Sequence, residues 1–333
     1  MNVRLPASDM VLIIEAVVCA LENAFHNSAL TEPQLVANFV WALPEYINNI
    51  HLPGETKVKA GGVFVHARPL VQPASFPCQS PKSVEIGDLL LIRTLVVDGS
   101  VKEKRALLLQ AKKADSIPAV PDNKNQWHLY EQWPLFTYAA RSGGLTGKKR
   151  HIKEPDMYDA AKYLLICTNP VAPWQAPPCC ITWPYYGLYH WPLKCAISTA
   201  QPTKPEIGRY QCFAHELVGF LIGNAGKYFN EPAPRTRGWD RVIQDLITET
   251  AKATTIFMGR AAGQTTRSTR GSGVLFMITA KQSDFFSVAF GGESTSSREP
   301  PDIPREWQSD DDTSGGISII EVIFEQEGGT KEP

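Results

Sequence analysis

The chain has 333 residues, of which 43% are hydrophobic and 20% are charged, and its formal net charge is −1. This composition is ordinary for a globular protein with a large core, and the near-zero charge excludes a strongly basic molecule. Any contact with nucleic acid must therefore come from a local group of basic residues. The seven cysteines are odd in number and scattered, which favours reduced thiols over a disulfide framework.

Two helices are expected at the start of the chain. The apolar run that begins at Met10 is interrupted by Glu15 and is too short to cross a bilayer. Residues 8–26 are therefore expected to form an amphipathic helix of a cytoplasmic protein. Thr31 is a candidate N-cap for a second helix. A short strand is expected near residues 62–67.

The most regular pattern is a pair of apolar runs at residues 84–97 and 104–112. The residues between them include Asp98-Gly99-Ser100, a sequence typical of a β-hairpin turn. The pattern therefore predicts two antiparallel strands that are neighbours in the sheet.

The rest of the chain alternates helices and strands, which predicts a mixed α/β fold. Residues 170–210 are rich in proline and are expected to be irregular. An aromatic helix is expected to carry Trp127 to Phe136, although Pro134 would bend or end it. Further helices are expected at 214–228 and 239–253, and strands at 163–168, 274–279, 285–290 and 317–324. We expect a core of residues 1–170 and a C-terminal extension of residues 171–333 packed on it, with a mobile loop at about 291–316.

The hairpin brings three polar residues together at the end remote from the turn. Depending on the centre of the turn, Asp88 lies opposite Gln110 or Lys112, and all three share one face. The Asp88 carboxylate, the Gln110 side-chain oxygen and the Ala111 carbonyl are hard ligands suited to Mg²⁺ or Mn²⁺. Lys112 beside them is expected to orient a water, and to help deprotonate it, for in-line attack on a phosphodiester.

This arrangement resembles the active-site hairpin of the PD-(D/E)xK nuclease superfamily, which has the restriction-endonuclease-like fold. Asp88 matches the first acid of the motif, and Gln110-Ala111-Lys112 matches its terminal part. Gln110 replaces the commoner acid, a Q-x-K form carried by Mrr-like restriction and bacterial antiphage-defence nucleases. The resemblance covers about residues 30–170, and the expected helix and strand after the hairpin fit the family's α-β-β-β-α-β core.

The resemblance implies a metal-dependent DNA endonuclease that acts as effector of a bacterial restriction or antiphage-defence system. The family often adds a glutamate from the helix before the hairpin. Glu32 is the candidate for this catalytic role, with Glu45 and Glu15 as rivals, whereas Glu85 is expected on the face opposite Asp88.

Basic residues offer contacts to the phosphate backbone of double-stranded DNA. Lys113 follows the motif, and Lys148, Lys149 and Arg150 belong to the densest basic loop. A solvated surface loop explains the same sequence. We also expect a partner protein or a homo-oligomer, and no membrane. The alternative function is a catalytically inactive subunit that binds nucleic acid or a partner protein, because Gln110 leaves one fewer negative metal ligand.

Overall fold

The computed structural model describes most of the chain. The described residues are 5–27, 29–65, 69–78, 82–115, 118–140, 142–154, 157–167, 196–261, 274–278 and 316–327. The strand expected at 285–290 and nearly all of the loop expected at about 291–316 lie outside these ranges.

Five described segments are α-helices: α1 (Ala7–Phe25), α2 (Glu32–Asn49), α3 (Lys124–Gln132), α4 (Phe213–Ile222) and α5 (Trp239–Ala261). The two N-terminal helices confirm the sequence prediction. Thr31 caps α2, because its backbone N–H and its hydroxyl both donate to Gln34 Oε1 at 2.9 Å. This reciprocal cap fixes the start of α2 and therefore the position of Glu32, its first residue.

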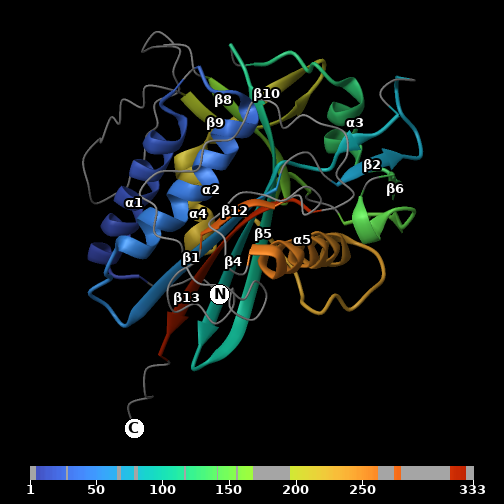
Figure 1. Ribbon diagram of the computed structural model, residues 1–333. Coiled ribbons are helices and arrows are strands. Elements are labelled where there is room, and N and C mark those ends of the chain that lie inside the picture. Colours follow the sequence, from blue (N-terminus) through green and yellow to red (C-terminus); the bar gives the residue numbers. More distant parts are fainter. Residues whose placement is uncertain are drawn as a thin grey trace.

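Nine described strands form one mixed sheet, so the mixed α/β class is confirmed (Figure 1). Its spatial order is β10 (Glu206–Cys212), β9 (Ala196–Thr203), β8 (Ala161–Cys167), β5 (Ser100–Lys113), β4 (Leu89–Val97), β13 (Ser318–Gln326), β1 (Thr56–Val65) and β12 (Val274–Ile278), and β11 (Lys227–Tyr228) pairs with β5. β8 is parallel to β5 and β13 is parallel to β4. The C-terminal strand β13 therefore lies between two strands of the N-terminal half.

A smaller antiparallel sheet stands beside the main one. It has the order β3 (Val84–Glu85), β2 (Leu70–Pro73), β6 (Phe136–Tyr138) and β7 (Lys149–Arg150). Two 3₁₀ turns, Gly143–Leu145 and Met157–Asp159, lie in the connections around β7. The small sheet matters for the site because β3 leads directly into Asp88.

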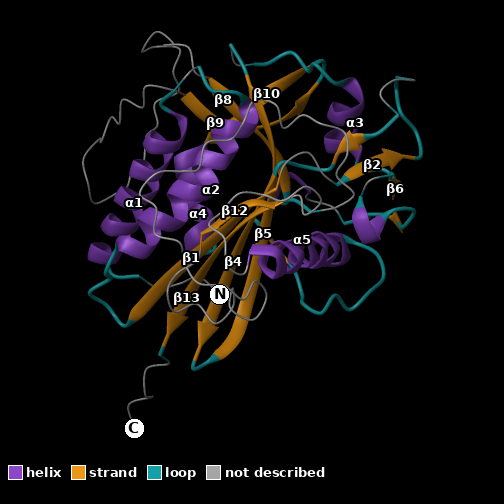
Figure 2. Cartoon of the chain, viewed as in Figure 1, coloured by secondary structure: helices purple, strands orange, loops and turns teal. Residues whose placement is uncertain are grey.

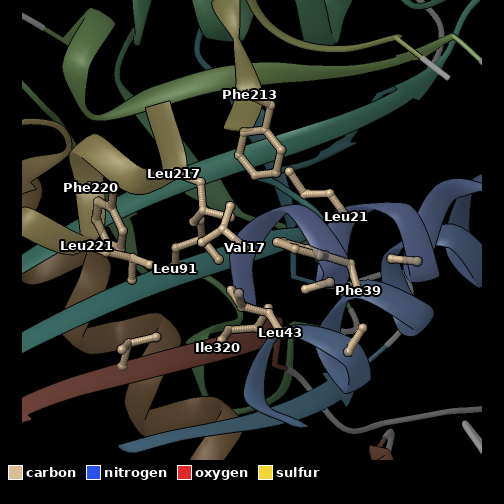
Figure 3. Close-up of a cluster of buried hydrophobic side chains, with 14 of the residues drawn as sticks. Val17, Leu21, Phe39, Leu43, Leu91, Phe213, Leu217, Phe220, Leu221 and Ile320 are labelled. Atoms are coloured by element: carbon tan, nitrogen blue, oxygen red, sulfur yellow. The ribbon is translucent and has the colours of Figure 1, made fainter. Parts of the chain in front are cut away.

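Helices cover both faces of the main sheet (Figure 2). α1, α2 and α4 pack on one face, where alternate residues of β4 and β5 such as Leu91 and Leu107 enter the core. Figure 3 shows part of this cluster: Val17, Leu21, Phe39, Leu43, Leu91, Phe213, Leu217, Phe220, Leu221 and Ile320. α3, α5 and the small sheet cover the other face, on which Leu90 and Leu108 are buried. The alternation along β4 and β5 thus separates two apolar layers.

Three sequence expectations are corrected. The aromatic helix ends at Gln132, because Trp133 adopts a left-handed conformation (φ 42°) and Pro134 follows, so Phe136 belongs to a strand. The helix expected at 214–228 ends at Ile222, where Gly223 (φ 91°) supplies the left-handed C-cap. The described part of the stretch expected to be irregular contains β9 and most of β10.

No helix in the described ranges is long and apolar enough to cross a membrane. Cys19, Cys78 and Cys167 are free thiols, as expected. Cys212 is disulfide-bonded, so the expectation of reduced thiols is wrong for this residue.

Candidate active site at the end of the hairpin

The turn of the β4–β5 hairpin sets the register of the site. Asp98 (φ 51°) and Gly99 (φ 70°) form a two-residue turn in the left-handed region, the conformation that Asp-Gly favours. Leu89 pairs with Leu109, so the next position outward places Asp88 opposite Gln110, the first of the two predicted registers. The hairpin prediction is therefore confirmed, and its register is resolved.

β5 continues past the start of β4, and two carboxylates replace the missing strand. Asp88 N–H donates to Leu109 O at 2.9 Å, and beyond this point β4 offers no partner to β5. Instead, Ala111 N–H donates to Asp88 Oδ2 at 2.7 Å and Lys113 N–H donates to Glu32 Oε2 at 2.9 Å. Glu32, from the first turn of α2, thus joins the residues of the motif at one strand edge.

The Gln110 side chain is fully buried, with its amide directed at Asp88. Gln110 Nε2 donates to Asp88 Oδ2, whereas Gln110 Oε1 is buried and accepts no hydrogen bond from any described residue. A buried amide oxygen without a donor is costly. Half a turn about the last side-chain bond exchanges the two amide atoms, and would direct Oε1 toward the same carboxylate.

The carbonyl of Ala111 faces the same edge. In an antiparallel strand, the N–H and C=O of one residue point to the same side. Because Ala111 N–H donates to Asp88 and Lys113 N–H donates to Glu32, the Ala111 carbonyl lies on the edge that both carboxylates occupy. Oxygen atoms of Asp88, Glu32 and Ala111 therefore line this strand edge.

Lys112 is surrounded by acids. Its Nζ lies 4.0 Å from Glu32 Oε1 and 3.5 Å from Asp122 Oδ2. Burial lowers the pKa of the Lys112 ammonium, but Glu32, Asp122, Asp88 and Glu85 outweigh this effect, so the pKa is raised. Lys112 is therefore a cation throughout the neutral range.

The pKa of the Asp88 carboxyl is raised well above its ordinary value. Burial is the main cause, and the charges of Glu85 and Glu32 raise the pKa further. Lys112 and the Ala111 N–H oppose the shift without cancelling it. Burial also raises the pKa of Glu32, again against the effect of Lys112. The site thus holds more negative charge than its single ammonium balances.

The sequence did not predict that two further acids, Glu85 and Asp122, lie near the site. Glu85 was expected on the face opposite Asp88, yet its charge is the largest carboxylate contribution to the raised pKa of Asp88. The two-residue alternation fails because β3 ends at Glu85 and the chain bends at Ile86–Asp88 before β4 begins. Asp122 lies in the loop after β5, and no local sequence signal places it beside Lys112.

The bend that carries Asp88 is supported from α3. The Tyr130 hydroxyl donates to Ile86 O at 2.9 Å, and the Tyr130 ring packs on Tyr163 with 5.0 Å between centroids. A Cβ on Gly87 would lie 2.7 Å from Leu108 Cδ1, so a larger residue at this position would have to displace the Leu108 side chain. Tyr130 and Gly87 therefore hold the Asp88 backbone against β5.

The remaining glutamate candidates lie elsewhere. Glu45 is near the other end of α2, and its Oε2 accepts a hydrogen bond from Trp41 Nε1 at 2.8 Å. Glu15 is exposed on α1. Of the three helix glutamates considered, Glu32 is the one whose carboxylate contacts β5 beside Lys112.

The predicted phosphate-binding residues divide into three environments. Lys113 is exposed next to the site, and its Nζ donates to Leu30 O at 3.2 Å. Lys148 and Lys149 are exposed at the far edge of the small sheet. Arg150 is buried, and its Nε lies 2.5 Å from Asp245 Oδ2 on α5. Its guanidinium is engaged within the fold, so we do not assign Arg150 to phosphate binding.

The donor set at Asp88 fits a divalent cation only with help from uncharged oxygens. Among the described residues, no three His, Cys, Asp or Glu side chains converge closely enough to hold one ion. The buried, unpaired Gln110 Oε1 and the Ala111 carbonyl are the hard ligands that would accompany Asp88. The orphaned amide oxygen is the observation that favours this fit.

Comparisons of the chain with protein-family models, with curated proteins and with solved structures found no match. The function is therefore inferred from the residues of the site.

Proposed function

We propose that the protein is a metal-dependent nuclease that cleaves the phosphodiester backbone of double-stranded DNA. The observation that carries the proposal is the convergence of Asp88, Gln110, Lys112 and Glu32 at the overhanging end of β5. An excess of carboxylates around one buried acid is typical of a functional site.

Asp88, Gln110 Oε1 and the Ala111 carbonyl would hold Mg²⁺ or Mn²⁺. When bound, such an ion lowers the pKa of a coordinated water and neutralises charge that develops on the phosphate. The raised pKa of Asp88 is the expected condition of a carboxylate that has no counterion of its own.

Lys112 would orient the attacking water and stabilise negative charge beside it. Because its pKa is raised, Lys112 donates hydrogen bonds and does not accept the proton of the water. The Lys112 ammonium lies 4.0 Å from a Glu32 oxygen and 3.5 Å from an Asp122 oxygen. The two carboxylates therefore position Lys112 beside the strand end.

The order of elements also supports the proposed relation to the PD-(D/E)xK superfamily. The chain runs through α2, β1, β4, β5, α3 and β8, in the α-β-β-β-α-β order, and the small-sheet strands are additional. The insertion of β13 between β1 and β4 departs from a sheet built by the N-terminal part alone. A role as effector in a bacterial antiphage-defence or restriction system rests on the Q-x-K resemblance.

A catalytically inactive subunit that binds nucleic acid or a partner is the second candidate. It is favoured by the amide N–H of Gln110, which faces Asp88, and by the lack of three convergent acidic, thiol or imidazole groups in the described part of the chain. This candidate predicts DNA binding without cleavage.

Incubation of the protein with supercoiled plasmid DNA and Mg²⁺ or Mn²⁺ tests the proposal. We expect nicked and linear products that require the metal and disappear in the presence of a chelator. Cleavage that persists in Asp88→Ala would contradict the assignment of this site, and an inert parent protein that still binds DNA would support the second candidate.

A further inference from the structure

The candidate active site cannot supply much affinity for a polyanion by itself. Glu32, Glu85, Asp88 and Asp122 surround the single ammonium of Lys112. Carboxylates repel the phosphates of nucleic acid at short distance. Affinity for the backbone must therefore come from another surface, and a chain with a net charge of −1 must gather basic residues locally to form it.

Two segments far apart in the sequence come together beyond the small sheet. Gly238 N–H donates to His151 O at 3.1 Å, and Trp239 N–H donates to Glu154 Oε1 at 3.1 Å. The basic loop after β6 thus lies beside the segment that leads into α5. Arg237 directly precedes Gly238 in this contact, and Arg235 lies two residues before Arg237.

Five exposed cations lie in these two segments, and we refer to them as the basic surface: Lys148, Lys149, Lys153, Arg235 and Arg237. None of them forms an ion pair with a described residue. Three described acids lie in the same segments: Glu154 accepts from Trp239 N–H, Asp240 accepts from Asn230 Nδ2, and Glu231 pairs with Lys104, so the exposed cations outnumber the acids. The positive charge of the basic surface is therefore available to solvent.

The small sheet connects the basic surface with the active site. Its edge strand β7 carries Lys149, and its opposite edge strand β3 carries Glu85, next to Asp88. Three strand spacings separate these edges, which corresponds to roughly 14 Å. A duplex covers this distance in about four base pairs. A bound backbone is thus long enough to span from the basic surface to the site.

We propose that the basic surface binds the phosphate backbone of duplex DNA and supplies the affinity that the acidic site lacks. The consequence for cleavage rests on the proposed function, whereas the binding itself does not. Arg235 and Arg237 belong to this surface although they are more than 80 residues from the lysine loop in sequence.

Binding of the full chain to a short fluorescent DNA duplex, measured by anisotropy in the presence of a chelator, tests the proposal without cleavage. The variants Lys148→Ala/Lys149→Ala and Arg235→Ala/Arg237→Ala each remove two charges from the basic surface. Lys57→Ala/Lys102→Ala removes the same charge from exposed positions at the turn end of the sheet. We expect each basic-surface pair to weaken binding about ten-fold and to reduce the salt slope by about two, and the control pair to leave both unchanged.

Equal affinities for the parent protein and the two basic-surface variants would overturn the proposal and leave the nuclease proposal intact. A parent protein that did not bind duplex DNA would also overturn the proposal for the basic surface. The same holds for a parent that bound vesicles of anionic lipid but not DNA. Loss of DNA binding in both basic-surface pairs, in a parent that binds but does not cleave, would support the basic surface and contradict the nuclease.

Discussion

Charged side chains are buried at several places in the described part of the molecule, and two of these places differ in how the charges are balanced. Between the main sheet and α4, Lys162 and Glu216 form an ion pair whose side chains are 1% and 0% exposed. One Glu216 oxygen accepts from Lys162, and the other accepts from the Thr199 hydroxyl. One acid thus meets one base, and both carboxylate oxygens have donors.

The end of β5 shows the opposite arrangement. Asp88 is close to two further carboxylates and shares a single ammonium with them, and the buried oxygen of Gln110 has no donor among the described residues. The balanced pair is what folding requires of buried charges, because an unpaired charge in a dry environment is costly. The excess at Asp88 lacks this balance among the described residues, and the cation of the proposed function would supply it.

The largest expected effect is the loss of cleavage activity when a charged residue at the end of β5 is removed. Asp88→Ala removes the central acid, and Lys112→Ala removes the ammonium that orients water. We expect each to reduce metal-dependent plasmid cleavage by about 100-fold or more. Glu55→Ala, an exposed acid remote from the hairpin end, is the matched control and should cleave like the parent. Full activity in both site variants would show that the acids at the end of β5 have no role in cleavage.

Substitutions in the balanced pair Lys162–Glu216 should lower the free energy of unfolding of the protein. Glu216→Leu leaves the buried Lys162 ammonium without its acid, and we expect a loss of about 3–5 kcal/mol in the free energy of unfolding, measured with urea. The double variant Lys162→Met/Glu216→Leu replaces both charges by apolar groups and should recover most of this loss. A double variant as unstable as the single one would show that the pair has a role beyond mutual neutralisation.

Much of the site was predictable from local sequence. Turn chemistry at Asp98-Gly99 and the two-residue period of strands were enough to bring Asp88, Gln110 and Lys112 to one strand end. The cap at Thr31 likewise placed Glu32 at the start of a helix. These features depend on neighbours in the sequence, which explains why a single chain revealed them.

Other features depend on contacts between distant segments. After the bend that follows β3, the charge of Glu85 raises the pKa of Asp88, and the burial of Arg150 depends on Asp245 of α5. The position of β13 between β4 and β1 pairs residues more than 220 positions apart. Hydrophobic patterning predicted that strand, but it contains no information about its neighbours.

Substitutions of Gln110 test whether its side-chain oxygen binds the proposed metal ion beside Asp88. Gln110→Glu adds a negative ligand of nearly the same shape, and Gln110→Leu removes the oxygen. Titration calorimetry with Mg²⁺ in the absence of DNA should show that the Glu variant binds the ion as tightly as the parent or more tightly, and that the Leu variant binds about ten-fold more weakly. Equal affinities in the Glu and Leu variants would exclude Gln110 as a ligand.

The smallest expected effect is a gain in thermal stability of Asp88→Asn over the parent protein, and this gain depends on pH. Burial and the neighbouring carboxylates raise the pKa of Asp88 in the folded protein. The folded state therefore holds a proton that the unfolded chain releases above about pH 4, and stability falls as the pH rises through the folded pKa. Asp88→Asn keeps an oxygen acceptor for the Ala111 N–H but has no charge to develop.

In a chelating buffer, we therefore expect the Tm of Asp88→Asn to equal that of the parent below about pH 4 and to exceed it by about 2–4 °C at higher pH. The matched control is Asp122→Asn, because the Asp122 side chain faces the same Lys112 but is 70% exposed, and water screens its charge. A difference between Asp88→Asn and the parent that did not change with pH would mean that the excess of acid at the strand end does not destabilise the fold. In that case the contrast with the balanced Lys162–Glu216 pair would lose its energetic basis.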